Sequence, residues 1–216
     1  MPDGNEKRVA AEAAALLVEN GMTVGLGTGS TVAFLLPALA SRGLDLRCVA
    51  TSVATETAAR DLGLQVESFA GIGALPRLDI AVDGADQVDP SGWLVKGGGA
   101  AHTREKAVAA AAERFVVIVS PEKLVDRLAP PVPLELLEFG LAATLERLGQ
   151  VELRDVPASP DGGVIADYTG ALDDPDELAA RLSATVGVVE HGLFPPALVS
   201  EVIVGRGETA ELRSYR

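Results

Sequence analysis

The sequence contains few of the side chains that bind soft metal ions or form disulfides. Its 216 residues include one cysteine and two histidines. A single cysteine cannot form an internal disulfide and gives no sign of an oxidising compartment. So few thiol and imidazole groups argue against a zinc site. The chain is nevertheless long enough to bury a core without disulfides or metal ions.

Long hydrophobic runs, basic residues and aromatic residues are scarce as well. The longest apolar run, residues 34–40, is far shorter than the ~18 residues of a membrane-spanning helix. The N-terminal sequence is charged and lacks an apolar signal core, so we expect a cytoplasmic protein without membrane contact. With 4% aromatic residues and 31 acids against 18 bases, the chain is not expected to bind nucleic acid. The net charge of −13 fits either a high-salt habitat or ordinary solubility.

Short apolar runs alternate with helical patterns through the first part of the chain. This alternation is typical of a Rossmann-like α/β domain, in which helices cover both faces of a parallel sheet. Pro37 predicts a kink or a break in the second helix. Strands are predicted at 22–26, 46–51, 78–83 and 115–120, and helices at 6–20, 30–42, 53–63 and 103–113.

Prolines at positions 130, 131 and 133 predict a domain boundary. Beyond them we expect a smaller α+β unit, and the last apolar segment, 198–205, is expected to rejoin the first sheet. The larger α/β domain would then comprise residues 1–128 plus 199–216, and the smaller α+β domain residues 129–198. The smaller unit is predicted to contain helices at 138–148 and 175–184 and strands near 151–154, 163–168 and 186–190.

The turn GLGTGST, residues 25–31, follows the first predicted strand and opens a helix. It lacks the third glycine of a dinucleotide fingerprint, because Ser30 stands there, and it lacks the lysine of a Walker loop. Its glycines expose backbone N–H groups, and Thr28, Ser30 and Thr31 add hydroxyl donors at a helix N-terminus, where anions are favoured. The turn therefore predicts phosphate binding, with an ordinary Ser/Thr-capped helix as the alternative.

Two acids, Asp83 and Asp86, follow the buried strand 78–83. Parallel sheets bind ligands at this edge, and two neighbouring carboxylates can divide acid and base work or hold sugar hydroxyls. An ordinary Asp-Gly turn and a Mg²⁺ site are the alternatives.

The segment KGGGAAHTREK, residues 96–106, contains three consecutive glycines, which cost backbone entropy and predict close approach to a ligand. Lys96, one of only four lysines, precedes them, and Glu105 lies at a predicted helix start, where a carboxylate also serves as a cap. His102 is a second candidate base, although a lone histidine there is more often a surface or capping residue. Lys123, in SPEK, follows another strand and is either an anion-binding residue or a solvated surface lysine.

Together these segments resemble one family closely, the ribose-5-phosphate isomerases of type A. The motifs GTGST, TSVATE, VDGAD, KGGGAAHTREK and SPEKLVD occur in the family's order and spacing. The resemblance continues through PPVPLELL, GGVIAD and GVVEHGLF, so that it covers essentially the whole chain. The departures are Gln87, His102, Pro37 and the segment 159–163, and none is a residue to which the resemblance assigns chemistry.

The resemblance implies an enzyme that interconverts D-ribose 5-phosphate and D-ribulose 5-phosphate through an enediolate, in the non-oxidative branch of the pentose phosphate pathway. It implies no cofactor and a homodimer or homotetramer. Glu105 matches the general base, and the residue matching Asp83 is linked to ring opening. The remaining implied contacts are Thr28, Gly29, Ser30, Thr31 and Lys123 near the phosphate, Asp83, Gly84, Ala85 and Asp86 at the sugar, and Lys96, Gly97, Gly98 and Gly99 at the reacting end.

Two other classes of protein remain open from the residues alone. A non-catalytic sugar-phosphate sensor on a similar sheet need not retain Lys96 or Glu105, yet both are present. A nucleotide-dependent oxidoreductase is disfavoured by Ser30 and by the absence of an acid placed to bind a ribose.

Overall fold

The computed structural model describes residues 2–215, and the chain divides into two compact units. The first unit comprises Met1–Ala85, Arg104–Lys123 and Pro196–Arg216, and the second comprises Asp86–Thr103 and Leu124–Pro195. The main difference from the expected boundaries is the segment 86–103, which belongs to the second unit. The reason is strand pairing, because β4 (Gln87–Val88) and β5 (Leu94–Val95) form a small sheet with β11 (Leu193–Phe194).

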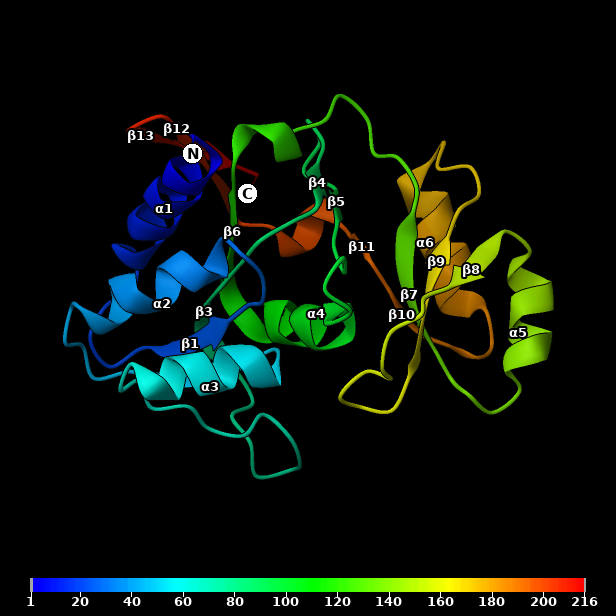
Figure 1. Ribbon diagram of the computed structural model, residues 1–216, viewed down its shortest axis with the longest axis horizontal. Coiled ribbons are helices and arrows are strands. Elements are labelled where there is room, and N and C mark those ends of the chain that lie inside the picture. The colour runs from blue at the N-terminus through cyan, green and yellow to red at the C-terminus, as the bar shows by residue number, and fades with distance from the viewer. Residues whose placement is uncertain (1, 216) are drawn as a thin grey trace. The chain divides into compact units, whose positions relative to one another are not determined.

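The first unit is built on a six-stranded sheet in the order β13-β12-β6-β3-β1-β2 (Figure 1). Neighbouring strands are parallel except for the hairpin of β12 with β13, which confirms the predicted parallel sheet and the return of the last apolar segment. The strands are β1 (Thr23–Leu26), β2 (Arg47–Ala50), β3 (Leu78–Asp83), β6 (Ala112–Val119), β12 (Glu201–Arg206) and β13 (Thr209–Ser214).

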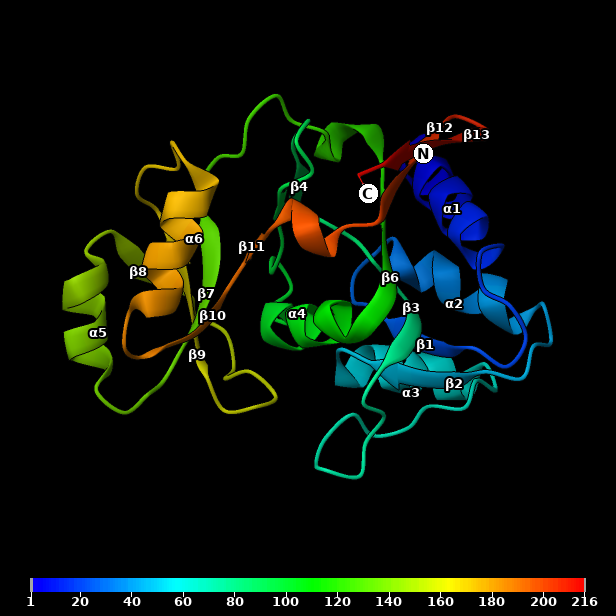
Figure 2. The same ribbon diagram turned by 180° about the vertical axis from the view of Figure 1, so that it is seen from behind.

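Helices cover both faces of this sheet, as the two opposite views show (Figures 1 and 2). α1 (Pro2–Ala15) and α2 (Val32–Ala40) pack together on one face, and α2 continues through Pro37 without a break. α3 (Val53–Asp61) lies beside β2. α4 (His102–Ala111) lies on the opposite face, where Val108 approaches β1 so closely that a Cβ at Gly25 would be 2.4 Å from it.

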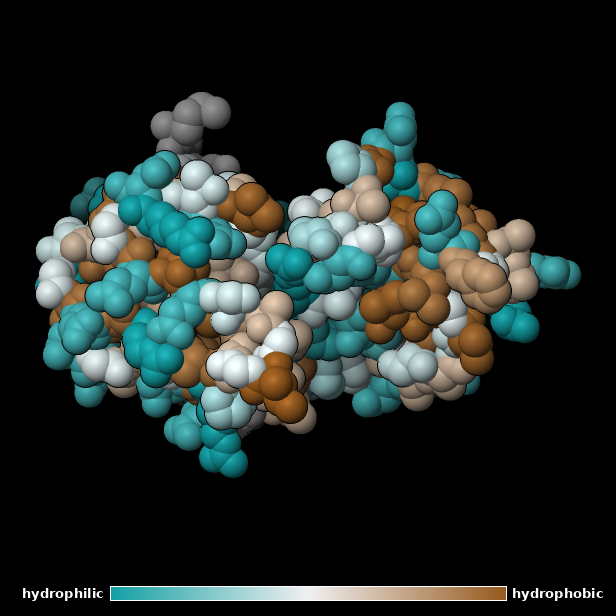
Figure 3. Space-filling view, turned by 90° about the horizontal axis from the view of Figure 1, so that it is seen from below, coloured by the Kyte–Doolittle hydropathy of each residue, from teal (hydrophilic) through white to brown (hydrophobic). Residues whose placement is uncertain are grey.

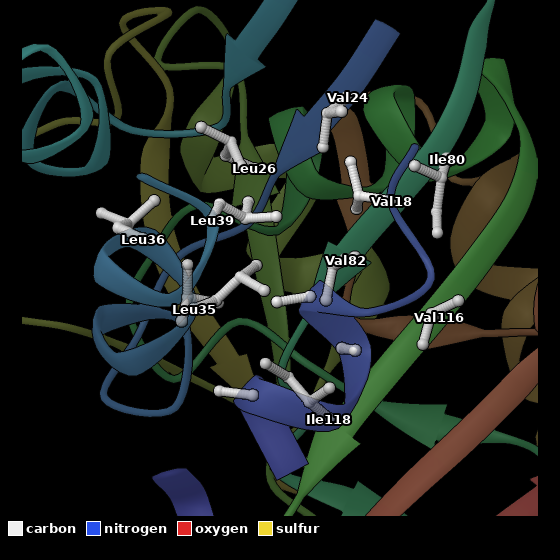
Figure 4. Close-up of a cluster of buried hydrophobic side chains, with 14 of the residues drawn as sticks. Val18, Val24, Leu26, Leu35, Leu36, Leu39, Ile80, Val82, Val116 and Ile118 are labelled. Carbon is white, nitrogen blue, oxygen red and sulfur yellow. The ribbon is translucent and has the colours of Figure 1, made fainter. Parts of the chain in front are cut away.

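The hydrophobic core of the first unit follows from the alternation of side chains along the strands. Every second residue of β1, β3 and β6 points to the face that α1 and α2 cover, and Figure 4 shows these side chains meeting those of α2. The cluster includes Val18, Val24, Leu26, Leu35, Leu36, Leu39, Ile80, Val82, Val116 and Ile118, all at most 3% exposed.

The second unit contains a four-stranded antiparallel sheet in the order β10-β7-β9-β8, with β7 (Val132–Leu136), β8 (Val151–Leu153), β9 (Val164–Tyr168) and β10 (Val188–His191). Two helices, α5 (Leu141–Leu148) and α6 (Pro175–Ala184), belong to it. α6 has the predicted bounds, and at its start the Asp174 carboxylate accepts hydrogen bonds from the amides of Asp176 and Glu177. No helix within residues 2–215 is both long and apolar enough to cross a membrane.

Candidate active site

The strand order of the first unit reverses direction at β1. From β1 the chain adds β2 on one side, and then crosses to add β3 on the other side. Such a reversal opens a crevice at the carboxyl ends of the strands, which is the usual ligand position in open α/β sheets. The glycine turn after β1 and Asp83 at the end of β3 both lie at this point.

Asp83 is buried beneath the glycine turn. Its side chain is 3% exposed, and its Oδ1 accepts hydrogen bonds from the amides of Thr28 (3.0 Å) and Gly84 (2.7 Å). A Cβ at Gly27 would lie 2.0 Å from this oxygen. Only glycine therefore lets the turn and the carboxylate approach as they do.

Two threonines that the sequence analysis left without a role support the same turn. Thr51 and Thr55 belong to TSVATE, just after β2. The Thr51 and Thr28 hydroxyl oxygens are 2.7 Å apart, and the Thr55 hydroxyl donates to the carbonyl of Gly27 at 2.9 Å. The run of hydroxyl residues directly after a strand was the sequence signal that could have revealed this role. In the structure these hydroxyl groups hold the neighbouring turn.

The turn leads into α2 through an exposed, glycine-dependent bend. Gly29 has a φ of +122°, which side-chain-bearing residues rarely adopt, and both Gly29 and Ser30 are exposed. Thr31 is the N-cap of α2, yet within the described residues its side chain makes no capping hydrogen bond. The structure therefore does not show the simple Ser/Thr-capped helix that was the alternative to a ligand-binding turn.

Glu105 lies in the first turn of α4 and is 5% exposed. Val108, three residues later and thus on the same face of the helix, packs over Gly25 of β1. Glu105 therefore belongs to the sheet-facing side of α4, and it is a buried carboxylate rather than a solvated helix cap.

Lys123 follows the third of three adjacent strands, β6, and is partly buried. It ends a short 3-10 helix, Pro121–Lys123, in which its amide donates to the carbonyl of Ser120 at 3.1 Å. The carboxyl ends of β1, β3 and β6 thus carry the glycine turn, Asp83 and Lys123 in that order.

The remaining candidate residues belong to the second unit, where Asp86 and the glycine loop are bound together. The amide of Asp86 donates to the carbonyl of Val95 (2.9 Å), and the amide of Gly98 donates to Asp86 Oδ2 (2.8 Å). Gly98 and Gly99 are exposed, whereas Gly97 is buried. The chain passes from one unit to the other between Asp83 and Asp86.

Lys96 is buried, with 3% of its surface exposed. Its amide donates to the carbonyl of Gly192 at 2.8 Å, and its Nζ lies 5.5 Å from the centre of the Phe194 ring, a favourable position for a cation over an aromatic face. A Cβ at Gly192 would lie 2.1 Å from the carbonyl oxygen of Lys96, so this strand pairing also depends on glycine.

His102 is fully buried at the start of α4, so the prediction of a surface position is wrong for it. Its ring packs against Gly97, where a Cβ would lie 2.8 Å from Nδ1. Gly97 also has a φ of +107°, so close packing and backbone conformation both require glycine there. Among the described residues, no three or more His, Cys, Asp or Glu side chains gather as a metal site.

The reversal in strand order, the hydroxyl- and amide-rich turn beside a buried carboxylate, and the buried glutamate on α4 define an α/β enzyme with its site at the carboxyl ends of parallel strands. A sequence profile of ribose 5-phosphate isomerase A (phosphoriboisomerase A) matches residues 47–209.

Relatives and solved structures match this chain over nearly its whole length. The ribose-5-phosphate isomerase A of Caulobacter vibrioides is 44% identical, with 96% of this chain and 97% of the relative covered. The crystal structure of ribose 5-phosphate isomerase A from Neisseria gonorrhoeae superposes with a TM-score of 0.90 at 33% identity, covering 97% of this chain and 96% of that one. A D-ribose-5-phosphate isomerase in complex with phospho-erythronic acid gives a TM-score of 0.91 at 34% identity, covering 99% and 100%.

The chain therefore belongs to the ribose 5-phosphate isomerase A family. The resemblance inferred from the motifs is confirmed, and the chain is an aldose–ketose isomerase. This finding decides against the sugar-phosphate sensor and the nucleotide-dependent oxidoreductase.

Proposed function

We propose that this chain interconverts D-ribose 5-phosphate and D-ribulose 5-phosphate through an enediolate, with Glu105 as the general base. The observation that carries the proposal is the burial of Glu105 on the sheet-facing side of α4, in a chain that belongs to this family. A buried carboxylate on a packed helix has a fixed position, which proton transfer to a substrate carbon requires.

The reaction moves one proton between neighbouring carbons. Glu105 removes the proton from C2 of the open-chain aldose, and the electrons of the broken C–H bond form the C1–C2 double bond of the enediolate while O1 gains the negative charge. The O2 hydroxyl proton passes to O1, and Glu105 then returns its proton to C1 as the C2 carbonyl forms. A single carboxylate can make both transfers, and one such group contributes roughly 10²–10⁴-fold in rate.

The charge on the enediolate oxygen needs fixed donors. Lys96 supplies an ammonium group in a buried position, and the amides of the glycine loop supply N–H donors. Preorganised donors of this kind stabilise a developing oxyanion most strongly where water is excluded. We assign Lys96, Gly97, Gly98 and Gly99 to this role.

The other candidate residues prepare the substrate. Asp83 is the acid–base group for opening the cyclic sugar, and Gly84, Ala85 and Asp86 contact the sugar hydroxyls. The turn residues Thr28, Gly29, Ser30 and Thr31 bind the phosphate together with Lys123. The exposed residues Gly29 and Ser30 before α2 and a partly buried lysine suit a dianion, and a phosphate held away from the reacting carbons orients the substrate.

The relative solved with phospho-erythronic acid supports this division of the substrate into a phosphate end and a reacting end. We propose that the same phosphorylated sugar acid competes with ribose 5-phosphate for this chain's site. Competitive inhibition is the expected result, and non-competitive inhibition would contradict the assignment.

The decisive variant is Glu105→Gln, which keeps the shape of the side chain and removes its basicity. We expect kcat to fall by about 10²–10⁴-fold while KM changes little, because the lost interaction acts only in the transition state. Glu146→Gln, an exposed residue of helix α5, is the matched control and should turn over normally. A folded Glu105→Gln enzyme with normal kcat would remove Glu105 as the base and make His102 the next residue to test.

Isotope incorporation tests the enediolate separately from the identity of the base. A base that exchanges its proton with solvent introduces deuterium at C1 or C2 when the reaction runs in D₂O. Product that stays free of deuterium after the equilibrium has been crossed many times would indicate hydride transfer instead of an enediolate.

We further propose that the chain forms a homodimer or homotetramer. In support, large hydrophobic side chains are exposed on the second unit, among them Phe139 at 94%, Val186 at 77% and Leu137 at 51%. The amide of Leu137 donates to the carbonyl of Gly187, so these three residues lie close together, and Figure 3 shows hydrophobic surface over this unit. Light scattering should give two or four times the chain mass, and a single-chain mass would overturn the proposal.

A further inference from the structure

Arg154 follows β8 in the second unit and connects a carboxylate to the glycine loop. Its side chain is 17% exposed and that of Asp167 is 19% exposed. Arg154 Nε and Nη2 donate to the two carboxylate oxygens of Asp167, each at 2.7 Å. Its Nη1 donates to the carbonyl oxygens of Gly97 at 2.9 Å and Gly98 at 3.2 Å.

These contacts fix the orientation of two successive peptide groups. In a trans peptide the carbonyl oxygen and the following N–H point in opposite directions. The Gly97 carbonyl faces Arg154, and the next amide, that of Gly98, points the other way and donates to Asp86. The Gly98 carbonyl also faces Arg154, so the amide of Gly99 is directed away from the guanidinium as well.

The loop itself offers little resistance to rotation of these peptide groups. Glycine populates more of φ/ψ space than any other residue, and three glycines in succession could present their amides in many directions. Gly98 and Gly99 are also exposed, so side-chain packing does not hold them. The Gly97 carbonyl also accepts from the amide of Ala100 at 3.0 Å, and Asp86 holds the Gly98 amide, so the contact of Arg154 with the Gly98 carbonyl matters most for the direction of the Gly99 amide.

We infer that Arg154, oriented by Asp167, is a positioning residue that aims the amide of Gly99 at the reacting end of the substrate. The inference rests on the proposed function of the glycine loop as an oxyanion-binding element. Arg154 does not touch the reacting atoms, because its guanidinium lies on the carbonyl side of the loop.

The chemistry of the pair suits arginine specifically. The guanidinium is planar and has five N–H donors, so that one edge meets Asp167 while the remaining nitrogen meets two carbonyls. The hydrogen bond with Asp167 raises the pKa of Arg154 above its usual value, although burial acts in the opposite direction. A lysine ammonium has no such fork and could not make both sets of contacts.

The test compares Arg154→Met and Arg154→Lys with Arg127→Met as the matched control. Arg127 lies in the same unit and also binds an aspartate, Asp173, but their side chains are 65% and 84% exposed. We expect both Arg154 variants to lose about 10- to 100-fold in kcat, since small misplacements of catalytic groups have effects of this size. KM for ribose 5-phosphate should change less than about threefold, because the phosphate anchors are untouched.

The split between kcat and KM separates positioning from simple stabilisation. A purely structural role predicts a lower melting temperature for Arg154→Lys with normal kcat at temperatures where the variant is folded, and that result would overturn the inference. If Arg154→Met and Arg154→Lys do not fold, the Asp167→Asn variant tests whether the pair positions the loop. It keeps the side-chain shape and one acceptor, and should lower kcat by several-fold; unchanged kcat in that variant would refute the positioning role.

The wild-type enzyme separates this inference from the proposed function. Wild-type protein that does not isomerise ribose 5-phosphate refutes the proposed function itself. Wild-type protein that is active, together with Arg154 variants that match Arg127→Met in kcat, refutes only the positioning role.

Discussion

Gly27→Ala is the substitution that the structure predicts to couple stability and catalysis most directly. The new methyl carbon would lie 2.0 Å from Oδ1, 2.1 Å from Cγ and 2.5 Å from Cβ of Asp83. All three distances are well inside van der Waals contact, and Asp83 is too buried to rotate into solvent. Either the turn or the carboxylate must move.

The free-energy cost has two parts. Forcing a methyl group into a packed site costs about 1–3 kcal/mol. Displacing Asp83 from the amide of Thr28 loses a hydrogen bond to a charged group, which contributes about 1.5–3 kcal/mol. A total of about 2.5–6 kcal/mol should lower Tm by roughly 5–24 °C in a chain of this length.

Gly73→Ala is the matched control for the same chemical change. Gly73 has no heavy atom within 4 Å of the position a Cβ would take, and its φ lies outside the left-handed range. Thermal unfolding followed by circular dichroism gives Tm, and a coupled assay with ribose 5-phosphate gives kcat. Gly27→Ala should also lose about 10²-fold in kcat, because we propose that Asp83 opens the sugar ring and the substitution displaces it. Equal Tm and equal kcat for the two variants would refute the assignment of Asp83 to a rigid position beneath the turn.

The remaining predictions concern Lys123, metal ions and Cys48. Lys123→Ala should mainly raise KM for ribose 5-phosphate, and free ribose should be a very poor substrate; equal turnover of ribose and ribose 5-phosphate would contradict phosphate recognition. Activity should survive exhaustive chelation, whereas a loss that only a divalent cation reverses would make Asp83 and Asp86 metal ligands. Burial raises the pKa of the Cys48 thiol to about 12, so the native protein should not react with a thiol reagent at pH 8 and the unfolded protein should react at once. Since the unfolded thiol ionises near pH 9 and the native one near 12, this residue's contribution to stability is full below pH 9 and is lost as the pH rises toward 12; a stability that does not fall in this window would contradict the assigned burial.

The strong patterns in the sequence predicted the larger sheet well. The strands β1, β2, β3 and β6 are runs of four to eight residues with buried side chains, and α2 and α3 end just before Gly43 and Gly63. Both signals are local, so they can be read without knowing the fold. Pro37 weakened the prediction of α2, yet the helix forms because four of its side chains, Val32, Leu35, Leu36 and Leu39, are buried in the core.

In the smaller sheets, β8, β9 and β10 formed where strands were predicted, whereas the remaining strands were missed because their signals are not local. β7 lies in the centre of its sheet although it contains Pro133, a residue that usually excludes a central strand. β4, β5 and β11 have two residues each, which is too short for any periodicity. The larger sheet has one such strand too, because β13 is a mostly exposed edge strand that pairs with β12 alone.

The candidate site likewise contains residues that local motifs reveal and one residue that they do not. Asp83, Lys96, Glu105 and Lys123 were proposed from motifs. Asp83, Lys96 and Glu105 are buried, which is rare for charged side chains. Arg154 was not identified, because it belongs to no motif and its role depends on residues more than fifty positions away. Only the folded chain shows which carbonyls its guanidinium reaches.

The chain crosses between the two units at four places, after Ala85, Thr103, Lys123 and Pro195. Neither unit is a continuous stretch of sequence, so neither can be released by a single protease cut or expressed by truncation at one end. Three of these crossings lie close to candidate site residues. The crossing after Ala85 lies within two residues of Asp83 and Asp86, the crossing after Thr103 lies within two residues of Glu105, and the crossing after Lys123 lies at that lysine itself. Most proteins tolerate insertions and deletions in the links between domains, but we expect this chain not to tolerate them at these three crossings. In a random insertion library selected for activity, new residues should be accepted in the exposed loop 68–77 and rejected at the three crossings.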